Sequence, residues 1–499
     1  MSSPATPVPA AAPPEYAQVM GHPRPLWMLF MTEFWERFAF YGMRWALTLY
    51  IVAQFFNGDA SGEKPSSELY GAYLALVYAA AIFGGYVADK LIGYQRAILL
   101  GAIIMAAGLF MVAYPDQTVF KLGLATVIVG NGLFKPIIST LVGKVYAQGD
   151  ERRDSGFTIF YMGINAGAFL APILTGILAE NIFGSSVMPA YKAVFIAAGI
   201  GMLISLVWFW FGRHQLKGVG LPPPDAMGMG RVLMVAVGAL VAIPVFFFLL
   251  TIEATTLQWI LMALFVVPAV MLLVEGMREG SVARDMVIAM LIIFAFNVLF
   301  WMFFEQAGSS FNFLADKIVD RQFGGWTFPV GWFQSVNSIA IITLAPVLAW
   351  LWVRMGRNNP SIPRKFGLGL IFNGLAFLLL VFALSNLVDG SGKIPFWTLF
   401  MVYVIQSIGE LCLSPIGLSM TTKLAPSRLT GLAMGCWFLS IAIGNNLSGL
   451  FAASVSGEGG MTVQSAQAGY NFGFWALVGA GVVLFLIAPL VQRLMHGVK

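Results

Sequence analysis

The sequence predicts an all-α polytopic membrane protein in which two six-helix bundles are joined by two extra transmembrane helices, 14 spans in all. Hydrophobic residues make up 59% of the 499 residues and charged residues only 10%, whereas soluble domains carry about 25% charged residues. The mean hydropathy is +0.82. Apolar runs of about 20 residues, enough to cross a bilayer, recur along the whole chain. These observations exclude a soluble fold.

Residues 1–25 are rich in Pro and Ala and lack an apolar run, so we expect a disordered tail and not a signal peptide. The expected spans are 27–53, 69–92, 96–115, 119–146, 157–181, 190–212, 229–250, 256–275, 284–308, 329–354, 365–387, 395–421, 429–453 and 469–495. Their even number puts both termini on one side. Nineteen of the 28 Lys and Arg residues fall on that side and six on the other. This bias predicts cytoplasmic termini in a cell membrane, the inner membrane of a bacterium.

The longest cytoplasmic linker is GRHQLKGVGLPPPDAMGMG, residues 212–230, and its Pro and Gly content marks a boundary between halves. The two spans after it contain no internal charge, so we expect them to face lipid. The predicted domains are a tail at 1–25, a six-helix bundle at 26–213, a linker with two extra helices at 214–280 and a second bundle at 281–499. Six spans before and six after the extra pair is the arrangement of major-facilitator transporters, with a site between the halves.

The first apolar run carries charges on one face of its predicted helix. At about 100° per residue, one face roughly 140° wide holds Glu33, Glu36, Arg37, Phe40, Tyr41 and Arg44. Each charge turned to lipid would cost about 2.5–3.5 kcal/mol. We therefore expect this face to line an internal, wettable cavity.

Seven ionisable residues fall well inside the spans. They are Glu33, Glu36, Arg37, Arg44 and Lys135 in the first half and Glu305 and Glu410 in the second. Left unpaired, they would cost on the order of 20 kcal/mol, so they must pair or be neutralised by protons or substrate. A single buried ion pair often serves only assembly, but seven groups on four spans favour a function. Pairs that bridge the halves predict gates that break and re-form.

The surroundings of Lys135 and Glu410 predict a zwitterionic ligand. Gly132 and Pro136 flank Lys135, and Pro415 follows Glu410. Helices broken at corresponding depths in two halves indicate a binding site. An anionic end near Lys135 and a cationic end near Glu410 would match these charges. The candidate pocket residues near the charges are the aromatic residues Phe40, Tyr41, Tyr73, Tyr78, Tyr161, Trp301 and Trp437 and the amides Asn165 and Asn337.

Protons and gating follow from the remaining polar residues. All three histidines, His22, His214 and His496, lie in tails or a loop, so carboxylates would have to carry any coupled protons. A nearby Arg favours an ionised carboxylate, and its departure favours the protonated form. In GGYVADKLIGYQR, residues 84–96, we expect Asp89 to latch the cytoplasmic gate with Lys90 and Arg96.

Several motifs recur in one order. They are Glu33-Phe-Trp-Glu36-Arg37-Phe38-Ala-Phe40-Tyr41-Gly42, Gly130-Asn131-Gly132-Leu-Phe-Lys135-Pro136, Phe160-Tyr161-Met-Gly-Ile-Asn165-Ala-Gly167 and Phe304-Glu305-Gln306. The first resembles the ExxERFxYYG signature of the proton-dependent oligopeptide transporter family, and the third resembles its FYxxINxGS signature. Residues 84–96 resemble the general major-facilitator loop motif. The resemblance covers about residues 26–495, and the chain departs from it at Phe40, where Tyr is usual, and at Ala168, where Ser is usual.

The resemblance implies proton-driven symport of di- and tripeptides. It implies that Arg44 and Lys135 receive the peptide carboxylate, that Glu410 lies near the amino end, and that Asn165 and Asn337 hold the peptide. Proton coupling would involve Glu33, Glu36, Arg37 and Glu305, and pocket aromatics would be Phe40, Tyr41, Tyr78, Trp301 and Trp437. The gating residues would be Asp89, Arg44, Glu305, Lys135 and Glu410. Phe40 lacks the hydroxyl of the usual Tyr, so the departure predicts an altered substrate preference.

Three alternatives to peptide symport follow. A related transporter could carry nitrate or another small anion, although such a cargo leaves Glu410 without a purpose. A peptide receptor would bind without transport. An intramembrane enzyme is disfavoured by the lack of His in the spans and of metal-ligand spacing, since Cys412 and Cys436 lie in apolar runs. We expect no cofactor, no metal, no nucleic-acid partner, protons as the coupling ion, and a functional monomer in the lipid bilayer.

Overall fold

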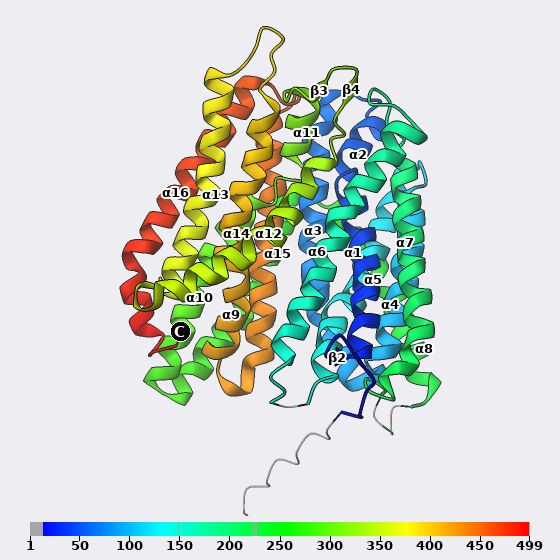
Figure 1. The fold of residues 1–499 in the computed structure, drawn as a ribbon, viewed down its shortest axis with the longest axis vertical. Helices are drawn as coiled ribbons and strands as arrows, with labels where there is room; N and C mark the ends of the chain where they lie inside the picture. The colour runs from blue at the N-terminus through cyan, green and yellow to red at the C-terminus, as the bar shows by residue number, and fades with distance from the viewer. Residues whose placement is uncertain (1–12, 148, 223, 225–226, 499) are drawn as a thin grey trace, which may run out of the picture.

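Long helices run side by side from one end of the molecule to the other and gather in two bundles in the computed structural model (Figure 1). The structure describes residues 13–147, 149–222, 224 and 227–498. The N-terminal bundle, blue to green in Figure 1, lies on the right, and the C-terminal bundle, yellow to red, lies on the left. The predicted all-α polytopic membrane fold is confirmed.

The helices of the N-terminal half are α1 (Arg24–Arg44), α2 (Leu47–Phe55), α3 (Glu63–Val87), α4 (Tyr94–Val112), α5 (Gln117–Lys144), α6 (Arg153–Ile177) and α7 (Tyr191–Gly212). Next come α8 (Met229–Thr251) and α9 (Ala254–Glu279). The C-terminal half contains α10 (Ser281–Phe304), α11 (Ser310–Lys317), α12 (Trp332–Met355), α13 (Ile362–Asn386), α14 (Phe396–Leu424), α15 (Thr430–Ser456) and α16 (Val463–Leu494).

Two small hairpins and a few single turns complete the described structure. The antiparallel pairs are β1 (Gln18–Val19) with β2 (His22–Pro23) and β3 (Gln322–Phe323) with β4 (Trp326–Thr327). Short helical turns are η1 (Ala60–Gly62), η2 (Ala88–Ile92), η3 (Leu178–Ile182), η4 (Arg213–Leu216), η6 (Gly356–Asn358) and η7 (Ser427–Leu429). We call the end that carries β1 and β2 the lower end, and the end that carries β3 and β4 the upper end, as in Figure 1.

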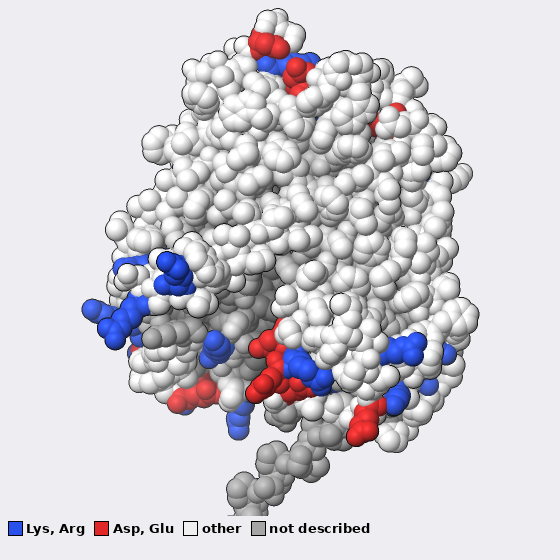
Figure 2. All heavy atoms as spheres, viewed as in Figure 1, with Lys and Arg blue, Asp and Glu red and all other residues white. Residues whose placement is uncertain are grey.

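Thirteen of the described helical segments are long and apolar enough to cross a membrane. The first apolar run is not among them, because Glu33, Glu36 and Arg37 lie within α1. Helix α1 packs against α6 and α7, which are both among the thirteen. Together with α2 it forms the first of the 14 predicted spans. Figure 2 shows charged side chains gathered toward the two ends of the molecule and a broad band between them without any. The band is the surface that a bilayer would cover.

Small residues bring the helices of each half close together. A Cβ added at Gly101 of α4 would stand 2.8 Å from the carbonyl oxygen of Gly130 on α5. In the other half a Cβ at Gly369 of α13 would stand 2.9 Å from the Gly409 carbonyl oxygen on α14. Membrane helices gain no hydrophobic driving force from each other, so such close backbone packing stabilises them.

Each half begins with a broken span. The predicted continuous span at 27–53 divides into α1 and α2, because the helix ends at Arg44 and resumes at Leu47. The predicted span at 284–308 likewise ends at Phe304, and α11 begins at Ser310. Both breaks free backbone carbonyl groups at membrane depth, where each needs a hydrogen-bond donor from the protein.

Part of the tail predicted to be disordered has a defined structure. Residues 1–12 lie outside the described residues, but β1 and β2 form a hairpin, and α1 begins at Arg24. The His22 imidazole is 2.8 Å from the Tyr146 hydroxyl, and Arg152 donates to the Gly21 carbonyl over 3.1 Å. These contacts to the loop after α5 hold a Pro- and Ala-rich segment that has no apolar run of its own.

The extra helices α8 and α9 pack mainly against different halves, although α9 also touches α3 of the N-terminal half. Only 11% of the apolar window of α8 and 17% of that of α9 are buried, as expected for helices that face lipid. Helix α8 packs against α3 and α5, whereas α9 packs against α10 and α15. Asn446 of α15 anchors the top of this pair by donating to the Ala254 carbonyl over 2.9 Å.

The backbones of the two halves approach closely near the upper end, where Gly71 of α3 meets Gly449 of α15. A Cβ at Gly71 would stand 2.6 Å from the Gly449 Cα. We expect Gly71→Leu to lower the free energy of unfolding in detergent by about 1–3 kcal/mol, because overpacking forces the two backbones apart. The control is Gly85→Leu on the same helix, where no atom lies within 4 Å. Equal losses in thermal unfolding of the two variants would contradict this interpretation of the contact.

Candidate functional site

A cavity of about 230 Å³ lies between the two halves, and most of the predicted site residues meet there. Its walls are Glu33, Arg37 and Tyr41 of α1, Lys135 and Ser139 of α5, Phe160, Tyr161, Ile164 and Asn165 of α6, Asn337 and Ser338 of α12, and Glu410 of α14. The one-face pattern of α1 explains its three residues, since positions 33, 37 and 41 follow at intervals of four and turn to the same side.

The N-terminal wall of the cavity holds a buried cluster of two acids and one arginine. The Arg37 Nε atom is 3.0 Å from Glu33 Oε1 and also pairs with the carboxylate of Glu36. The Asn131 amide donates to Glu36 Oε1 over 3.2 Å. Glu36 is fully buried, whereas Glu33 and Arg37 also line the cavity. The cluster therefore extends from the cavity wall into the buried core of the N-terminal half.

Lys135 faces the same cavity without a counter-ion. Its Nζ atom lies 4.2 Å from the centroid of the Tyr78 ring, a cation–π contact. Among the described residues no carboxylate forms an ion pair with Lys135. Pro136, next in the chain, lies inside α5. A charged amine that is held on a cavity wall and left unpaired is suited to receive an anionic group.

The C-terminal wall presents the opposite charge. Glu410 Oε2 accepts a hydrogen bond of 3.0 Å from the Asn337 amide, which also donates to Ser407 Oγ over 2.9 Å. In the part of the chain that the structure describes, Glu410 forms no ion pair. Asn165, across the cavity, donates to the Tyr161 carbonyl over 3.0 Å and keeps its amide oxygen available. A carboxylate without a cation thus faces an amine without an anion.

Above the cavity, Arg44 and Glu305 join the halves. Arg44 Nη2 lies 2.6 Å from Glu305 Oε2, and Arg44 Nε donates to the Tyr70 hydroxyl over 2.7 Å. The Arg44 guanidinium also stands 5.5 Å from the centroid of the Tyr41 ring. Arg44 therefore engages Glu305 and is not among the residues that line the cavity with Lys135. The predicted site in which Arg44 and Lys135 share one carboxylate is not assembled in this conformation. Glu305 thus lies at this contact between the halves above the cavity, which we call the seal, and not in the cluster of Glu33, Glu36 and Arg37.

Backbone carbonyl groups at the break of each first span accept hydrogen bonds from side chains of the other half across this seal. The Asn312 amide donates to the Trp45 carbonyl over 2.7 Å, and Thr48 Oγ1 donates to the Gly308 carbonyl over 2.8 Å. Arg44 and Glu305 stand at the same two breaks. Backbone carbonyls freed in one half are thus paired by side chains of the other, which makes the seal specific for this arrangement.

Other contacts between the halves also lie above the cavity. Ser335 donates to the Phe169 carbonyl over 2.7 Å, and Trp332 donates to the Ile173 carbonyl over 3.2 Å. Higher up, Glu63 pairs with Lys317 over 2.7 Å. Between described residues, every hydrogen bond or ion pair that joins the halves lies on this side of the cavity. Figure 2 shows the surface hollowed in its lower half. The molecule is therefore closed at its upper end.

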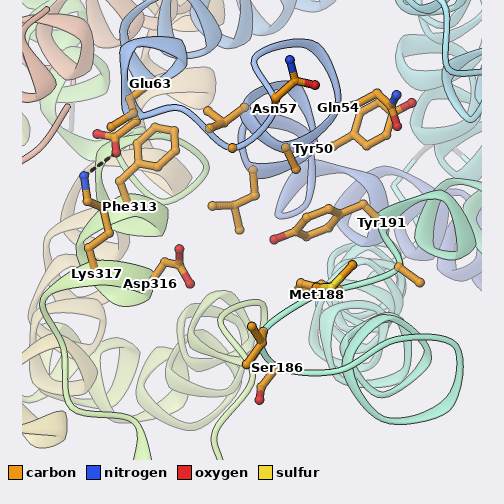
Figure 3. Close-up of a pocket in the computed structure, with 18 of the residues that line it drawn as sticks. Tyr50, Gln54, Asn57, Glu63, Ser186, Met188, Tyr191, Phe313, Asp316 and Lys317 are labelled. Atoms are coloured by element: carbon orange, nitrogen blue, oxygen red, sulfur yellow. Dashed lines mark hydrogen bonds and ion pairs between the residues drawn. The ribbon is translucent and has the colours of Figure 1, made fainter. Parts of the chain in front are cut away.

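A larger pocket of about 760 Å³ lies above the seal, at the upper end (Figure 3). Asp316 and Tyr191 point toward its centre from opposite sides. Both of its carboxylates already have cationic partners, since Glu63 pairs with Lys317 and Asp316 with Arg321 over 3.2 Å. It lacks the two facing unpaired charges of the smaller cavity, which we therefore take as the candidate site.

Five predicted pocket aromatics lie outside the residues that line the cavity, and they are Phe40, Tyr73, Tyr78, Trp301 and Trp437. Trp301 donates to Asn297 over 3.0 Å, and Trp437 packs 5.7 Å from the Phe294 ring, both in the core of the C-terminal half. Phe40 is buried, with the Arg37 guanidinium 5.4 Å from its ring centroid. Tyr78 touches the site only through Lys135. Proximity to a charge along the sequence did not separate pocket aromatics from packing aromatics.

The lower end differs from the predicted latch. Asp89 accepts a hydrogen bond from the Tyr94 hydroxyl, and among the described residues it forms no ion pair with Lys90 or Arg96. Arg96 instead donates to the Met227 carbonyl over 2.9 Å. The sharp turn at Gly93, where φ is +79°, places Tyr94 against Asp89. The predicted latch of Asp89 with Lys90 and Arg96 is therefore not engaged in this conformation, in which the upper end is closed, and its role in closing the lower end stays a prediction.

The structure adds residues that the sequence analysis did not assign to the site. Ser139 lies one helical turn after Lys135, so helical spacing was an available signal for it. Ser338 directly follows Asn337, and neighbouring helix positions do not share a face, so spacing gave no signal there. Asn131, which supports Glu36, and Tyr70, which supports Arg44, needed contacts between helices that no local pattern reveals. Tyr161 stood among the nearby aromatics and lines the cavity.

Comparisons with known proteins agree with this geometry. The family model PTR2, described as the POT family, matches residues 95–464. The chain is 35% identical over 489 residues to the uncharacterized transporter YclF of Bacillus subtilis (strain 168), with 96% of each chain covered. It is 35% identical over 505 residues to the peptide transporter YePEPT of Yersinia enterocolitica subsp. palearctica serotype O:3 (strain YE-P4), again with 96% of each covered.

Solved structures give the same result. A crystal structure of the peptide transporter POT in complex with sulfate has a TM-score of 0.83 and 35% identity, covering 97% of this chain and 98% of that chain. A POT family transporter in complex with 5-aminolevulinic acid has a TM-score of 0.80 and 29% identity, covering 95% of this chain and 98% of that chain.

The seal makes a prediction about stability. In Asn312→Ala the Trp45 carbonyl loses its donor, and a buried polar group left unpaired costs about 1–3 kcal/mol. We expect a loss of that size in the free energy of unfolding, measured by thermal or denaturant unfolding in detergent. The control is Asn386→Ala, whose exposed amide donates to a carbonyl of its own helix and should change stability by less than about 0.5 kcal/mol. A loss no larger than in the control would show that the break is satisfied in another way.

Proposed function

Because the chain belongs to the POT family, whose members are transporters and not enzymes, we propose that it is a proton-coupled symporter of di- and tripeptides that works by alternating access. One observation carries the proposal: Lys135 and Glu410, each without an ionic partner among the described residues, face one cavity from opposite halves. A short peptide has an amine at one end and a carboxylate at the other, so it neutralises both charges at once.

The relatives support a ligand of this kind. The names of similar proteins include peptide transporters and dipeptide and tripeptide permeases. The 5-aminolevulinic acid bound to one solved relative also carries one amine and one carboxylate. In this proposal, recognition relies on an amine and a carboxylate that every peptide has. We therefore expect low selectivity for peptide side chains.

We propose the following cycle. The upper end faces the cell exterior, and the lower end, with both termini, faces the cytoplasm. When the Arg44–Glu305 pair and the hydrogen bonds at the two breaks part, the cavity opens upward and peptide and protons enter. The peptide carboxylate binds Lys135, with Arg44 available to it once released from Glu305. Re-formation of the seal closes the upper end and gives the downward-open state described above.

Glu33 and Glu36 are the proposed proton carriers. Both share the single cation of Arg37, so two carboxylates compete for one positive charge in a buried site. Like charges in such a cluster favour protonation of one partner. Binding of a peptide beside Lys135 alters the field at Glu33, since both residues line the cavity. Asn165, Asn337 and Tyr41 are the proposed peptide-backbone contacts.

Chemical editing of the ligand tests the two ends separately. We expect Lys135→Ala to weaken dialanine binding about 10–100-fold, the loss of one charge-assisted hydrogen bond of about 1.5–3 kcal/mol. The variant should no longer distinguish dialanine from its C-terminal amide. Glu410→Ala should instead lose the distinction between dialanine and N-acetyl-dialanine. Binding is measured calorimetrically with the purified protein.

The controls for this test are Lys144→Ala, on the same helix and outside the cavity, and competition with nitrate. Lys144→Ala should bind dialanine as the unchanged protein does. If Lys135→Ala and Glu410→Ala keep both distinctions, the assignment of the ends is wrong. If nitrate binds and dialanine does not, the cargo is a small anion.

Proton coupling is tested in proteoliposomes. We expect Glu33→Gln and Glu36→Gln to spare exchange of labelled dialanine across the membrane and to abolish accumulation driven by an inward proton gradient. The neutral amide keeps the shape of the side chain and removes the titrating group. Glu458→Gln, in an exposed loop at the upper end, should retain full accumulation. Gradient-driven uptake at the normal level in both cluster variants would contradict the assignment.

A further inference from the structure

An apolar groove runs between the extra helix α8 and the N-terminal bundle. It has a volume of about 450 Å³ and is separate from the transport cavity. Its walls are Ala80, Phe83, Gly84, Val87 and Leu91 from α3 and η2, Val129, Gly132 and Leu133 from α5, and Met234, Val235, Gly238, Ala239, Ala242, Val245 and Phe246 from α8. None of these side chains is polar. Because α8 is only 11% buried over its apolar window, the groove lies within reach of lipid.

The groove has the length of one leaflet. Along α8 it extends from Met234 to Phe246, about 18 Å at 1.5 Å per residue, and half of a hydrocarbon core of about 30 Å is about 15 Å. It begins at Met234, five residues above the lower end of α8, and stops at Phe246, five residues below the upper end. An acyl chain that enters from the lower headgroup region would fill it.

Glycine keeps the groove open. A Cβ added at Gly238 would meet no atom within 4 Å, so no helix contact requires glycine there. Gly84 and Gly132 differ, because added Cβ atoms at both would run into neighbouring backbone. A glycine inside a helix costs about 1 kcal/mol relative to alanine, and at Gly238 the space that it leaves is not used by the protein.

Cations surround the lower mouth of the groove. Arg231 lies one turn before Met234 on the same side of α8, and its Nη1 atom donates to the Lys90 carbonyl over 3.3 Å. Lys90 is exposed and adjoins Leu91 of the groove wall. Arg96 is tied to the residue Met227 before α8, and its Nη1 atom is buried without a hydrogen-bond partner. Asp89, which directly precedes Lys90, accepts a hydrogen bond from the Tyr94 hydroxyl.

From this combination we infer that the groove is a binding site for one anionic phospholipid. The acyl chain lies along α8 against α3 and α5, and the phosphate lies at the lower mouth beside Lys90, Arg96 and Arg231. Basic side chains at the end of an apolar crevice between membrane helices are the chemistry that recognises anionic headgroups. The chain would touch Gly132 and Leu133, the turn of α5 just before Lys135, and would support the segment that presents this cation to the cavity.

Native mass spectrometry of the full-length protein tests the inference. The purified protein is incubated with phosphatidylglycerol or phosphatidylcholine of identical acyl chains, and the retained lipid is counted. We expect one phosphatidylglycerol to be retained at least 5-fold more than phosphatidylcholine. Gly238→Leu should reduce phosphatidylglycerol retention at least 5-fold, and Lys90→Gln should reduce the preference for phosphatidylglycerol. A 1,000-fold excess of glycerol 3-phosphate should displace none, because the headgroup alone lacks the chain.

The matched control is Gly479→Leu on α16, another exposed glycine with no atom within 4 Å of an added Cβ. It should retain phosphatidylglycerol as the unchanged protein does. Val245→Trp provides a second way to fill the groove if Gly238→Leu fails to fold, as judged by thermal unfolding. The inference would be overturned by equal retention of the two lipids or by full retention of phosphatidylglycerol in both groove-filling variants. It would also be overturned if detergent at the same concentration as phosphatidylglycerol displaced this lipid.

Discussion

The energetic cost of an isolated charge inside a membrane protein governs this structure. Ionised side chains in the spans require a partner, because desolvation is expensive in a medium of low dielectric constant. Five of the seven predicted intramembrane charges find fixed partners, with Arg37 held by Glu33 and Glu36 and Arg44 held by Glu305. The other two, Lys135 and Glu410, face a cavity. In the proposed function, their unpaired state is what would give the cavity an affinity for a zwitterion.

The same constraint explains how the halves hold together. Both halves break their first span at the same depth, and each break exposes carbonyl groups that the membrane cannot solvate. The opposite half supplies the donors, through Asn312 and Thr48, and Arg44 and Glu305 meet at the same place. A seal made of a few polar contacts is strong when formed and separable in one step. This suits a gate better than a continuous apolar interface would.

Much of the architecture is readable from the sequence. Long apolar runs predict the helices, and the charged face of residues 33–44 predicts that α1 borders a cavity. Lys135 and Glu410 are recognisable as charges inside apolar runs, although the expected helix breaks at Pro136 and Pro415 are absent, since both prolines lie inside continuous helices. The sequence does not reveal that Arg44 is engaged at the seal while Lys135 is free, since this depends on how the halves are tilted. Trp301 lies one turn before Glu305 in the chain, but its ring and that of Trp437 fill the core between helices.

The most direct test of the account is a structure of the protein with dialanine bound. The account predicts that the peptide carboxylate lies within about 4 Å of Lys135 Nζ and the peptide amine within about 4 Å of the Glu410 carboxylate, the distance of an ion pair. A peptide bound in the reverse orientation, or one whose ends avoid both residues, would contradict it.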